Sequence, residues 1–508
     1  MAFLKIKSFD SAFLDIESVT TSNLTEKALF RKAQALYGLQ RFRECCEVLK
    51  ALRLAYPSNK SGKEELDRAI GRLAEQTHGR YQFKQLYAEA ARLRPPHLDH
   101  AIYTGPVVVK DSGISPGGRG LFTTKAVAAG DLLVCEKAFA HAFIDESNDG
   151  HGGISMTILI DAMSDRATMG SEPELINMMI RKCHHNPSLA TAITDLHHGT
   201  YEPVETSSVD GGPIVDSFLI RRIIALNSFG CPLTTRDFRL SMASKTSPGP
   251  SEAFHSSGIW PTASYINHSC TSNARRSFIG DMMIVRATCD LPPNTELRWW
   301  YQPPGTEPTS YLSHQKPLLK NWGFMCKCAI CRDMRDTPES VMQKRRQLRS
   351  QFRSLIPTGR GLSFGGALGM NVLKKAEAVV DKLKATFKKP AAQVPRLAVT
   401  DLQLVLAREY ENRMQPVETC RLALAALESF GFVVEGGELP RREGGGGPAV
   451  RGSGLMTDSV IDCWMFLRNA YRVAAPEFAA AAEGYAKTAY RICIGEDETF
   501  HETYGCLL

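Results

Sequence analysis

Three cysteines in one short stretch constrain this chain more than any other feature of its sequence. Cys326, Cys328 and Cys331 are spaced as Cys-x-Cys-x-x-Cys, and no further cysteine or histidine follows closely. Thiolates suit tetrahedral zinc, which needs four ligands, so the remaining ligand must come from elsewhere in the chain. The best upstream candidate is Cys270, which closes the run Asn-His-Ser-Cys. The spacing therefore predicts a zinc site that ties two distant segments together.

Two alternatives to a zinc site are open. The clustered cysteines could be reduced thiols in a loop, or they could form disulfides, which a reducing compartment disfavours. The chain has 14 cysteines in all. Those that stand singly in largely apolar segments are expected to act as small buried hydrophobes; they are Cys135, Cys183, Cys231, Cys289, Cys420, Cys463 and Cys493.

The composition indicates a globular protein of a reducing compartment. Hydrophobic residues make up 43% of the chain and charged residues 23%, which are ordinary values. The first residues, "MAFLKIKSFD", lack the pattern of a signal peptide. No window approaches the run of about eighteen apolar residues that a membrane span needs. We therefore expect a cytoplasmic or nuclear protein with no membrane partner.

The charge distribution argues against nucleic acid as a direct partner. The net charge of +7 is mild for 508 residues, and the chain carries no recognised binding motif or concentrated basic stripe. The densest basic run, "QKRRQLRSQFR" from Gln343 to Arg353, is interpreted as the solvated face of a helix. We expect a monomer that does not bind nucleic acid directly.

Helical regions are predicted at both ends of the chain. Apolar residues recur at helical spacing between residues 24 and 95, with a turn at 38–40, and a looser second helical pair ends at Pro95-Pro96. The first pair, about 34 residues long, resembles a tetratricopeptide repeat (TPR), and an ordinary helical hairpin is the alternative. We assign residues 1–100 to this region. Residues 334–508 form a C-terminal helical domain, with a disordered low-complexity loop near 434–454.

The middle of the chain, residues 101–333, has a different character. Short β-rich stretches are broken by Gly and Pro, and a helical insert is expected at about 145–230. A hairpin is predicted around Gly280-Asp281. The fold class is therefore α+β, with a β-rich core between helical regions.

Several blocks of sequence follow one another in the order of a known family. They are "GRGLFTTKAVAAGDLL", "ALNSFGC", "GIWPTASYINHSCTSNA", "IVRATCDLPPNTELRWWY" and "NWGFMCKCAICRD". The set resembles a SET-domain protein methyltransferase with its post-SET cysteine cluster, of the MYND-associated (SMYD-like) branch. The match covers about Val107 to Asp333, and Asn-His-Ser-Cys with the downstream cysteines is its most specific part. The helical C-terminal region also resembles that branch.

The resemblance implies an activity and a set of site residues. It implies methyl transfer from S-adenosylmethionine (SAM) to lysine side chains of proteins, histone or non-histone. Tyr301 falls at the position of the catalytic tyrosine, and Phe229 and Trp322 fall at aromatic positions of the lysine channel. The implied zinc ligands are Cys270, Cys326, Cys328 and Cys331. The implied cofactor-binding residues are Gly118, Arg119, Gly120, Asn227, Asn267, His268, Tyr301 and Phe324.

The chain also departs from the family pattern. The usual Gly-Glu-Glu before the tyrosine is reduced to Glu296, and Trp299 and Trp300 replace aliphatic residues. The segment "AFIDESNDGHGG" and the residues after it lack the cysteine and histidine series of a MYND finger. A non-catalytic scaffold, in which a SET-like core and the helical regions bind partner proteins, is the alternative. A metal-dependent hydrolase is disfavoured, because zinc held by four thiolates has no open position for water.

Overall fold

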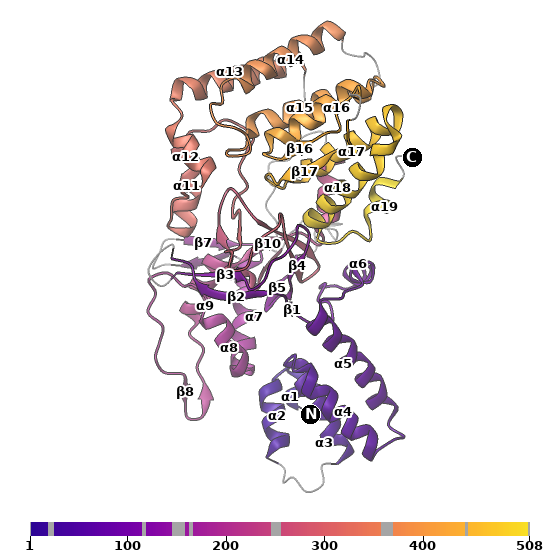
Figure 1. The fold of residues 1–508 in the computed structure, drawn as a ribbon. Helices are drawn as coiled ribbons and strands as arrows, with labels where there is room; N and C mark the ends of the chain where they lie inside the picture. The colour runs from indigo at the N-terminus through magenta and orange to yellow at the C-terminus, as the bar shows by residue number, and fades with distance from the viewer. Residues whose placement is uncertain are drawn as a thin grey trace, which may run out of the picture.

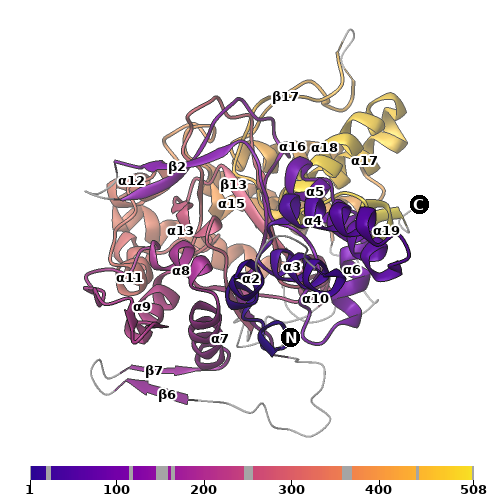
Figure 2. The ribbon, with the colours of Figure 1, turned by 90° about the horizontal axis from the view of Figure 1, so that it is seen from below.

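The chain forms a helical end, a strand-rich centre and a second helical end (Figure 1). The computed structural model describes residues 2–18, 25–113, 118–144, 158–161, 166–244, 256–356, 369–441 and 445–505. The first N-terminal helices lie below the centre in Figure 1, so in Figure 2, which is seen from below, they stand in front of the rest of the chain. The segment from Ala142, which lacks the cysteine and histidine series of a MYND finger, continues into residues 145–157. Those residues lie outside the part of the chain that the structure describes.

The N-terminal region consists of helices, as its apolar spacing predicts. They are α1 (Ala2–Lys5), α2 (Phe9–Glu17), α3 (Glu26–Gly38), α4 (Phe42–Ala55), α5 (Lys60–His78) and α6 (Phe83–Arg92). Helices α3, α4 and α5 share one apolar core that includes Leu36, Leu49 and Leu66. The expected second pair does not form a hairpin of its own. Helix α6 packs through Leu86 and Tyr87 against the central strands instead.

The centre is a group of small sheets. A four-stranded sheet has the order β1 (Tyr103–Thr104), β4 (Leu132–Lys137), β14 (Met282–Ala287), β13 (Ala274–Ile279). Its β13–β14 hairpin turns at Gly280, whose φ of 56° suits glycine, so the hairpin predicted there is present. The other sheets pair β10 (Phe229–Cys231) with β11 (Ser256–Ile259) and β5 (Ala140–Ala142), β2 (Val107–Asp111) with β3 (Arg119–Thr123), and β12 (Asn267–His268) with β15 (Arg298–Trp299). A 3-10 helix, η2 (Ala263–Tyr265), precedes β12.

The insert expected at about 145–230 is only partly helical. It contains α7 (Glu172–His185), α8 (Pro187–Thr194) and α9 (Ser217–Asn227). It also contains two antiparallel pairs, β6 (Ile158–Asp161) with β7 (Arg166–Met169) and β8 (Ser208–Val209) with β9 (Gly212–Pro213). Helix α10 (Thr235–Ser244) follows β10. The hairpin β6–β7 lies where the sequence predicted a helical insert. Ile158 and Ile160 are exposed on it.

Helices dominate the C-terminal region. They are α11 (Tyr311–Trp322), α12 (Ala329–Asp336), α13 (Glu339–Leu355), α14 (Met370–Lys384), α15 (Leu397–Glu411), α16 (Pro416–Ser429), α17 (Asp458–Ala474), α18 (Pro476–Ile494) and α19 (Phe500–Tyr504). They share one large apolar core with the cysteine cluster. Among the described residues, no helix combines the length and the apolar character needed to cross a membrane.

The low-complexity stretch near 434–454 is ordered in its described part, so the expected disordered loop is wrong there. It forms an antiparallel pair, β16 (Val433–Glu435) with β17 (Ala449–Gly452). Side chains of the neighbouring helices hold it, because the Tyr471 hydroxyl donates to the Gly437 carbonyl at 2.7 Å. The Val450 N–H also donates to the Tyr485 hydroxyl at 3.2 Å. Composition missed these contacts because they come from distant parts of the chain.

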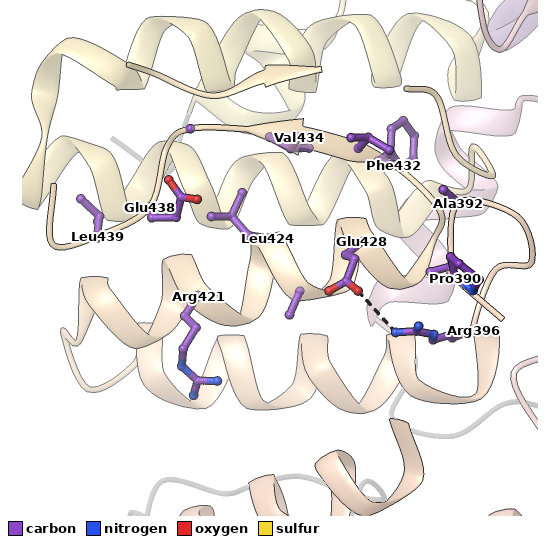
Figure 3. Close-up of a pocket in the computed structure, with 14 residues that line it drawn as sticks. Pro390, Ala392, Arg396, Arg421, Leu424, Glu428, Phe432, Val434, Glu438 and Leu439 are labelled. Carbon is purple, nitrogen blue, oxygen red and sulfur yellow. Dashed lines mark hydrogen bonds and ion pairs between the residues drawn. The ribbon is translucent and has the colours of Figure 1, made fainter. Parts of the chain in front are cut away.

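A cavity of about 620 Å³ lies between α16 and the segment that leads into β16 (Figure 3). Leu424 and Val434 line it, and Arg396 donates to Glu428 at 3.3 Å at one side. Among the described residues that line it, none was predicted from the sequence as a site residue.

The basic run of α13 is not a solvated face throughout. Arg349 is 1% exposed, and its guanidinium donates to Asp401 at 2.7 and 2.8 Å and to Glu307 at 2.6 Å. The guanidinium of Arg345 lies 3.7 Å from the centre of the Phe387 ring. Arg349 therefore joins the segment after β15 to α15 through a buried guanidinium, whose partners Glu307 and Asp401 are 51% and 40% exposed. A charge count alone does not predict this.

We expect Arg349→Met to destabilise the protein by about 1.5–3 kcal/mol, because it removes the hydrogen bonds of a buried guanidinium to charged groups while Glu307 and Asp401 stay solvated. Urea unfolding followed by circular dichroism measures the loss. The matched control is Arg335→Met on α12, where the Arg335 and Asp336 side chains are 57% and 54% exposed. It should cost less than about 1 kcal/mol. Similar losses of unfolding free energy for both variants would mean that burial of the Arg349 guanidinium contributes nothing extra to stability.

Candidate functional site

The site forms where two segments far apart in the sequence cross. Strands β12 and β15 pair in parallel, and the Ser269 N–H donates to the Trp299 carbonyl at 2.9 Å. The Arg298 N–H donates to the side-chain oxygen of Asn273 at 2.7 Å, and the Asn273 N–H returns to the Arg298 carbonyl at 2.9 Å. These bonds hold the segment that leads to Tyr301 against the Asn-His-Ser-Cys segment.

Asn267 links this crossing to the glycine-containing strand β3. Its side-chain N–H donates to the Arg119 carbonyl at 3.0 Å and to a Glu296 carboxylate oxygen at 2.8 Å. A Cβ atom at Gly120 would stand 2.7 Å from that carboxylate and 3.2 Å from the Asn267 amide. Gly120 therefore allows a close approach of backbone to the Asn267 and Glu296 side chains that any larger residue would block.

The side chain of Arg119 turns away from Asn267 toward the insert. Its guanidinium pairs with Asp195 at 2.5 Å and lies 5.1 Å from the centre of the Tyr265 ring. The Tyr265 hydroxyl donates to the same carboxylate at 2.7 Å. The hydrogen bond to Asp195 raises the pKa of Arg119. The charge of Arg119 is thus engaged by Asp195, while its carbonyl accepts from Asn267.

His268 connects the predicted tyrosine to the cysteine cluster. The Tyr301 N–H donates to its Nδ1 at 2.9 Å, so a neutral imidazole carries its hydrogen on Nε2. Nε2 lies 3.5 Å from the sulfur of Cys270. The ring centre lies 5.4 Å from that of Tyr301 and 5.6 Å from that of Phe324. The imidazole thus braces the turn through both ring nitrogens and through its contacts with Tyr301 and Phe324.

Tyr301 stands in an aromatic surround. Its ring centre lies 5.1 Å from that of Trp322 and 6.1 Å from that of Phe324. The hydroxyl donates to the Ile266 carbonyl at 3.1 Å. Burial raises the pKa of Tyr301, and the charge of Arg276 opposes this shift only in part. The hydroxyl therefore stays protonated at neutral pH and can donate or accept a hydrogen bond.

Phe229 lies among other aromatic side chains of the same core. Its ring centre is 5.7 Å from that of Trp299 and 6.0 Å from that of Trp260. The guanidinium of Arg276 sits over two of these rings, 5.4 Å from the centre of Phe229 and 4.9 Å from that of Trp299. Sequence reasoning missed Arg276. The signal was a pair of adjacent arginines, Arg275 and Arg276, beside the segment for which a hairpin was predicted.

Two predicted cofactor residues lie in other settings. The Asn227 side chain donates to the carbonyls of His197 and Ile223, both at 2.8 Å, so its amide hydrogens are engaged by the insert. The Gly118 carbonyl accepts from the Ser112 N–H at 2.9 Å, just before β3. Within the described part of the chain, no hydrogen bond joins Asn227 to Asn267 or His268.

The cysteine cluster comes together as its spacing predicts. The sulfurs of Cys270, Cys326, Cys328 and Cys331 all lie within 4.8 Å of one another. Cys270 lies 3.6 Å from Cys331 and 4.0 Å from Cys326. Zinc–sulfur bonds of about 2.3 Å in a tetrahedron place sulfurs about 3.8 Å apart. The described cysteines are free, so the donor set and its separation fit a structural zinc ion.

Neighbouring groups hold the cluster in place. The Cys326 N–H donates to the side-chain oxygen of Gln315, on α11, at 2.7 Å. His314, on the same helix, places Nε2 3.3 Å from the Cys270 sulfur. Sequence reasoning missed both residues, because they lie on α11, well before the cysteines in the chain, and show no metal-ligand spacing of their own. Trp322 ends α11 and Phe324 lies between this helix and Cys326, so the cluster also positions the aromatic residues around Tyr301.

Comparison with known proteins agrees with this geometry. Residues 118–302 match the model of the SET domain. The chain is 36% identical, over 97% of its length, to a "Methyltransferase" of Gibberella zeae, and it spans 66% of that relative's length. Short stretches, each 15% of the chain, match "Histone-lysine N-methyltransferase ASHR2" (35% identical, 20% of its length) and "Histone-lysine N-methyltransferase ASHR1" (36%, 15%) of Arabidopsis thaliana. Residues 118–302 of this chain are thus a SET domain, and the crossing of β12 and β15, with Tyr301 beside it, lies within it.

Proposed function

We propose that this protein is a SAM-dependent methyltransferase that acts on lysine side chains of proteins, histone or non-histone. The observation that carries the proposal is the position of Tyr301. Tyr301 is half-buried among aromatic rings, and its hydroxyl donates to the carbonyl of Ile266, next to Asn267, which meets the backbone of β3. The SET domain and the methyltransferase names of the relatives support the same reaction.

The residues around Asn267 fit a nucleoside-containing cofactor. Gly120 lets the backbone of β3 lie against Asn267 and Glu296, which fixes the Asn267 side chain beside this strand. Gly118, Arg119 and Gly120 would offer backbone groups, and Phe324 would offer a ring face. The other residues that would hold the cofactor are Asn227, Asn267, His268 and Tyr301. SAM, when bound, supplies a methyl group on a sulfonium sulfur.

The chemistry of the acceptor explains the aromatic surround. A lysine nitrogen attacks with its lone pair, so the ammonium group must first lose its proton. In water the pKa of this group is about 10.4, so most lysines are protonated at neutral pH. Aromatic faces tolerate an approaching cation and exclude water. Phe229 and Trp322 would line this passage. The Tyr301 hydroxyl and the Ile266 carbonyl would orient the amine, and such orientation accounts for much of the rate of this kind of reaction.

We propose that the cysteine cluster binds zinc as a structural ion. Four thiolates fill every tetrahedral position, which leaves no site for water or substrate. The ion would fasten α11 and the segment from Trp322 to Cys331 to Cys270. Its role would be to hold Trp322 and Phe324 beside Tyr301.

The wider assignment is also a proposal. We place the chain in the SMYD-like branch without a MYND finger, with residues 1–100 as a TPR-like region, 101–333 as SET and post-SET, and 334–508 as a C-terminal helical domain. The helical regions would shape the groove for a protein substrate. We propose a monomer in the cytoplasm or nucleus.

A non-catalytic scaffold is the second candidate, because bulky side chains stand where the family has aliphatic ones. Trp299 is 1% exposed and packs against Phe229, which narrows the space beside the predicted channel. SAM binding without methyl transfer to any protein in a cell extract would favour this candidate.

Tyr301→Phe should lower methyl transfer about 10- to 100-fold, because it removes an orienting hydrogen bond at the reacting amine. SAM affinity, measured by calorimetry, should stay close to that of the wild type. Transfer is measured with labelled SAM on core histones and on a whole-cell protein extract. The matched control is Tyr485→Phe, which removes a hydroxyl that accepts from the Val450 N–H on β17. This variant should transfer methyl groups at the wild-type rate. Equal loss of transfer and SAM affinity in Tyr301→Phe would contradict the assignment.

Cys270→Ser should lower the zinc content below the expected value of about one ion per chain, because serine replaces one of four thiolates. Elemental analysis of the purified protein measures this. Cys493→Ser changes a fully buried cysteine outside the cluster and should keep its zinc. Removing zinc with a chelator should also change tryptophan fluorescence, because Trp322 loses its place near Tyr301. Full zinc in Cys270→Ser would rule out Cys270 as a ligand.

A further inference from the structure

Arg276 brings a positive charge into the aromatic core beside Tyr301. It lies on β13, and its guanidinium sits over the rings of Phe229 and Trp299 at 5.4 and 4.9 Å. One of its N–H groups donates to the Trp300 carbonyl at 3.1 Å. Phe229 and Trp299 belong to the same core as Tyr301, so the charge stands in the wall of the proposed lysine passage.

No carboxylate pairs with this charge in the part of the chain that the structure describes. Burial, and then the neighbouring Arg275, lower the pKa of Arg276 to about 10. Its guanidinium still remains charged at neutral pH. Arg275 differs, because it reaches the C-terminal region and pairs with Asp458 at 2.6 Å.

The remaining ionisable groups near this place do not neutralise it. Tyr301 faces Arg276 from the end of β15 and stays protonated. Glu296 acts on Tyr301 from the same segment, but its carboxylate is paired with Arg298 and accepts from Asn267. The elements that pack against Arg276 through Phe229 and Trp300 present aromatic rings and a carbonyl.

The wall is also rich in hydrogen-bond donors. The indole N–H of Trp299 is buried and has no partner among the described residues. Arg276 adds further N–H groups, of which one uses the Trp300 carbonyl. An ammonium ion can only donate, so these N–H groups offer it no hydrogen-bond acceptor, whereas a neutral amine keeps its one lone pair for attack on the methyl carbon. The polar groups of the wall thus favour the same form of the amine as the charge does.

We propose that Arg276 is a positioning residue that selects the neutral form of the acceptor lysine by repelling its protonated form. This inference rests on the proposed methyltransferase function. A like charge within several ångströms in a partly buried site lowers an amine pKa by about one to two units. The neutral amine that the reaction needs therefore becomes more abundant near neutral pH. A trimethylated lysine keeps its charge at every pH, so Arg276 would also disfavour the last methylation step.

The test compares the pH dependence of kcat in the wild type, Arg276→Met and Arg276→Lys, with labelled SAM and core histones or a whole-cell protein extract. The rising limb of kcat reports groups in the enzyme–substrate complex. We expect Arg276→Met to move this limb upward by about one to two pH units and to regain activity as pH rises. Arg276→Lys keeps the charge and should keep the limb. Mass spectrometry should show more trimethyl-lysine for Arg276→Met than for the wild type.

The controls separate this role from other roles of the side chain. Arg275→Met removes the neighbouring arginine, whose charge is already paired, and should shift the limb much less. An unchanged limb in Arg276→Met would overturn the inference and leave the proposed function standing. So would a gain in kcat/KM that is equal at every pH, which would mean that Arg276 merely obstructs the passage. A folded, SAM-binding Arg276→Met variant that is inactive at every pH would likewise overturn it. A wild-type protein that transfers no methyl group to either acceptor preparation contradicts both proposals.

Discussion

The pairing of β12 with β15 is the contact on which the rest of the site depends. It is short, but it is reinforced on both sides, by Ser269 bonded to Trp299 and by Asn273 bonded to Arg298 in both directions. Through it, Asn267 reaches the backbone of β3 and His268 reaches Tyr301. The cysteine cluster then extends the same contact to α11. The proposed cofactor site, the aromatic side chains around Tyr301 and the cysteine cluster therefore all depend on this one strand pairing.

Two arginines, the buried Arg349 and the half-buried Arg276, show how the surroundings decide what a charge does. Arg349 is enclosed by Glu307 and Asp401, so its charge stabilises the junction between the segment after β15 and the C-terminal helices. Arg276 meets aromatic rings and a carbonyl instead. A half-buried charge without a carboxylate partner among the described residues costs stability. Its place beside Tyr301 therefore calls for an explanation other than stability. Selection of a neutral amine provides one.

Local patterns predicted local structure well where neighbouring residues decide it. Helical spacing located α3, α4, α17 and α18, and the turn at Gly280 joins β13 to β14 as expected. The predictions were wrong where distant partners decide. Composition indicated disorder near residues 434–454, but Tyr471 and Tyr485 hold that segment in place. The basic run of α13 suggested a solvated face, but Arg349 is buried against carboxylates from other segments.

The sequence alone determined which residue types are present in the spacing that a metal and a SET domain need. The cysteine spacing led directly to the cluster that the structure assembles, because three of the four thiols are fixed by local geometry and only Cys270 has to come from afar. Only the tertiary structure decided what surrounds each group. It engaged the Asn227 amide in the insert, joined His268 to Cys270, and set Arg276 among aromatic rings. The physical reason is that hydrogen bonds and charge pairs join residues far apart in the chain, and no local pattern specifies the partner.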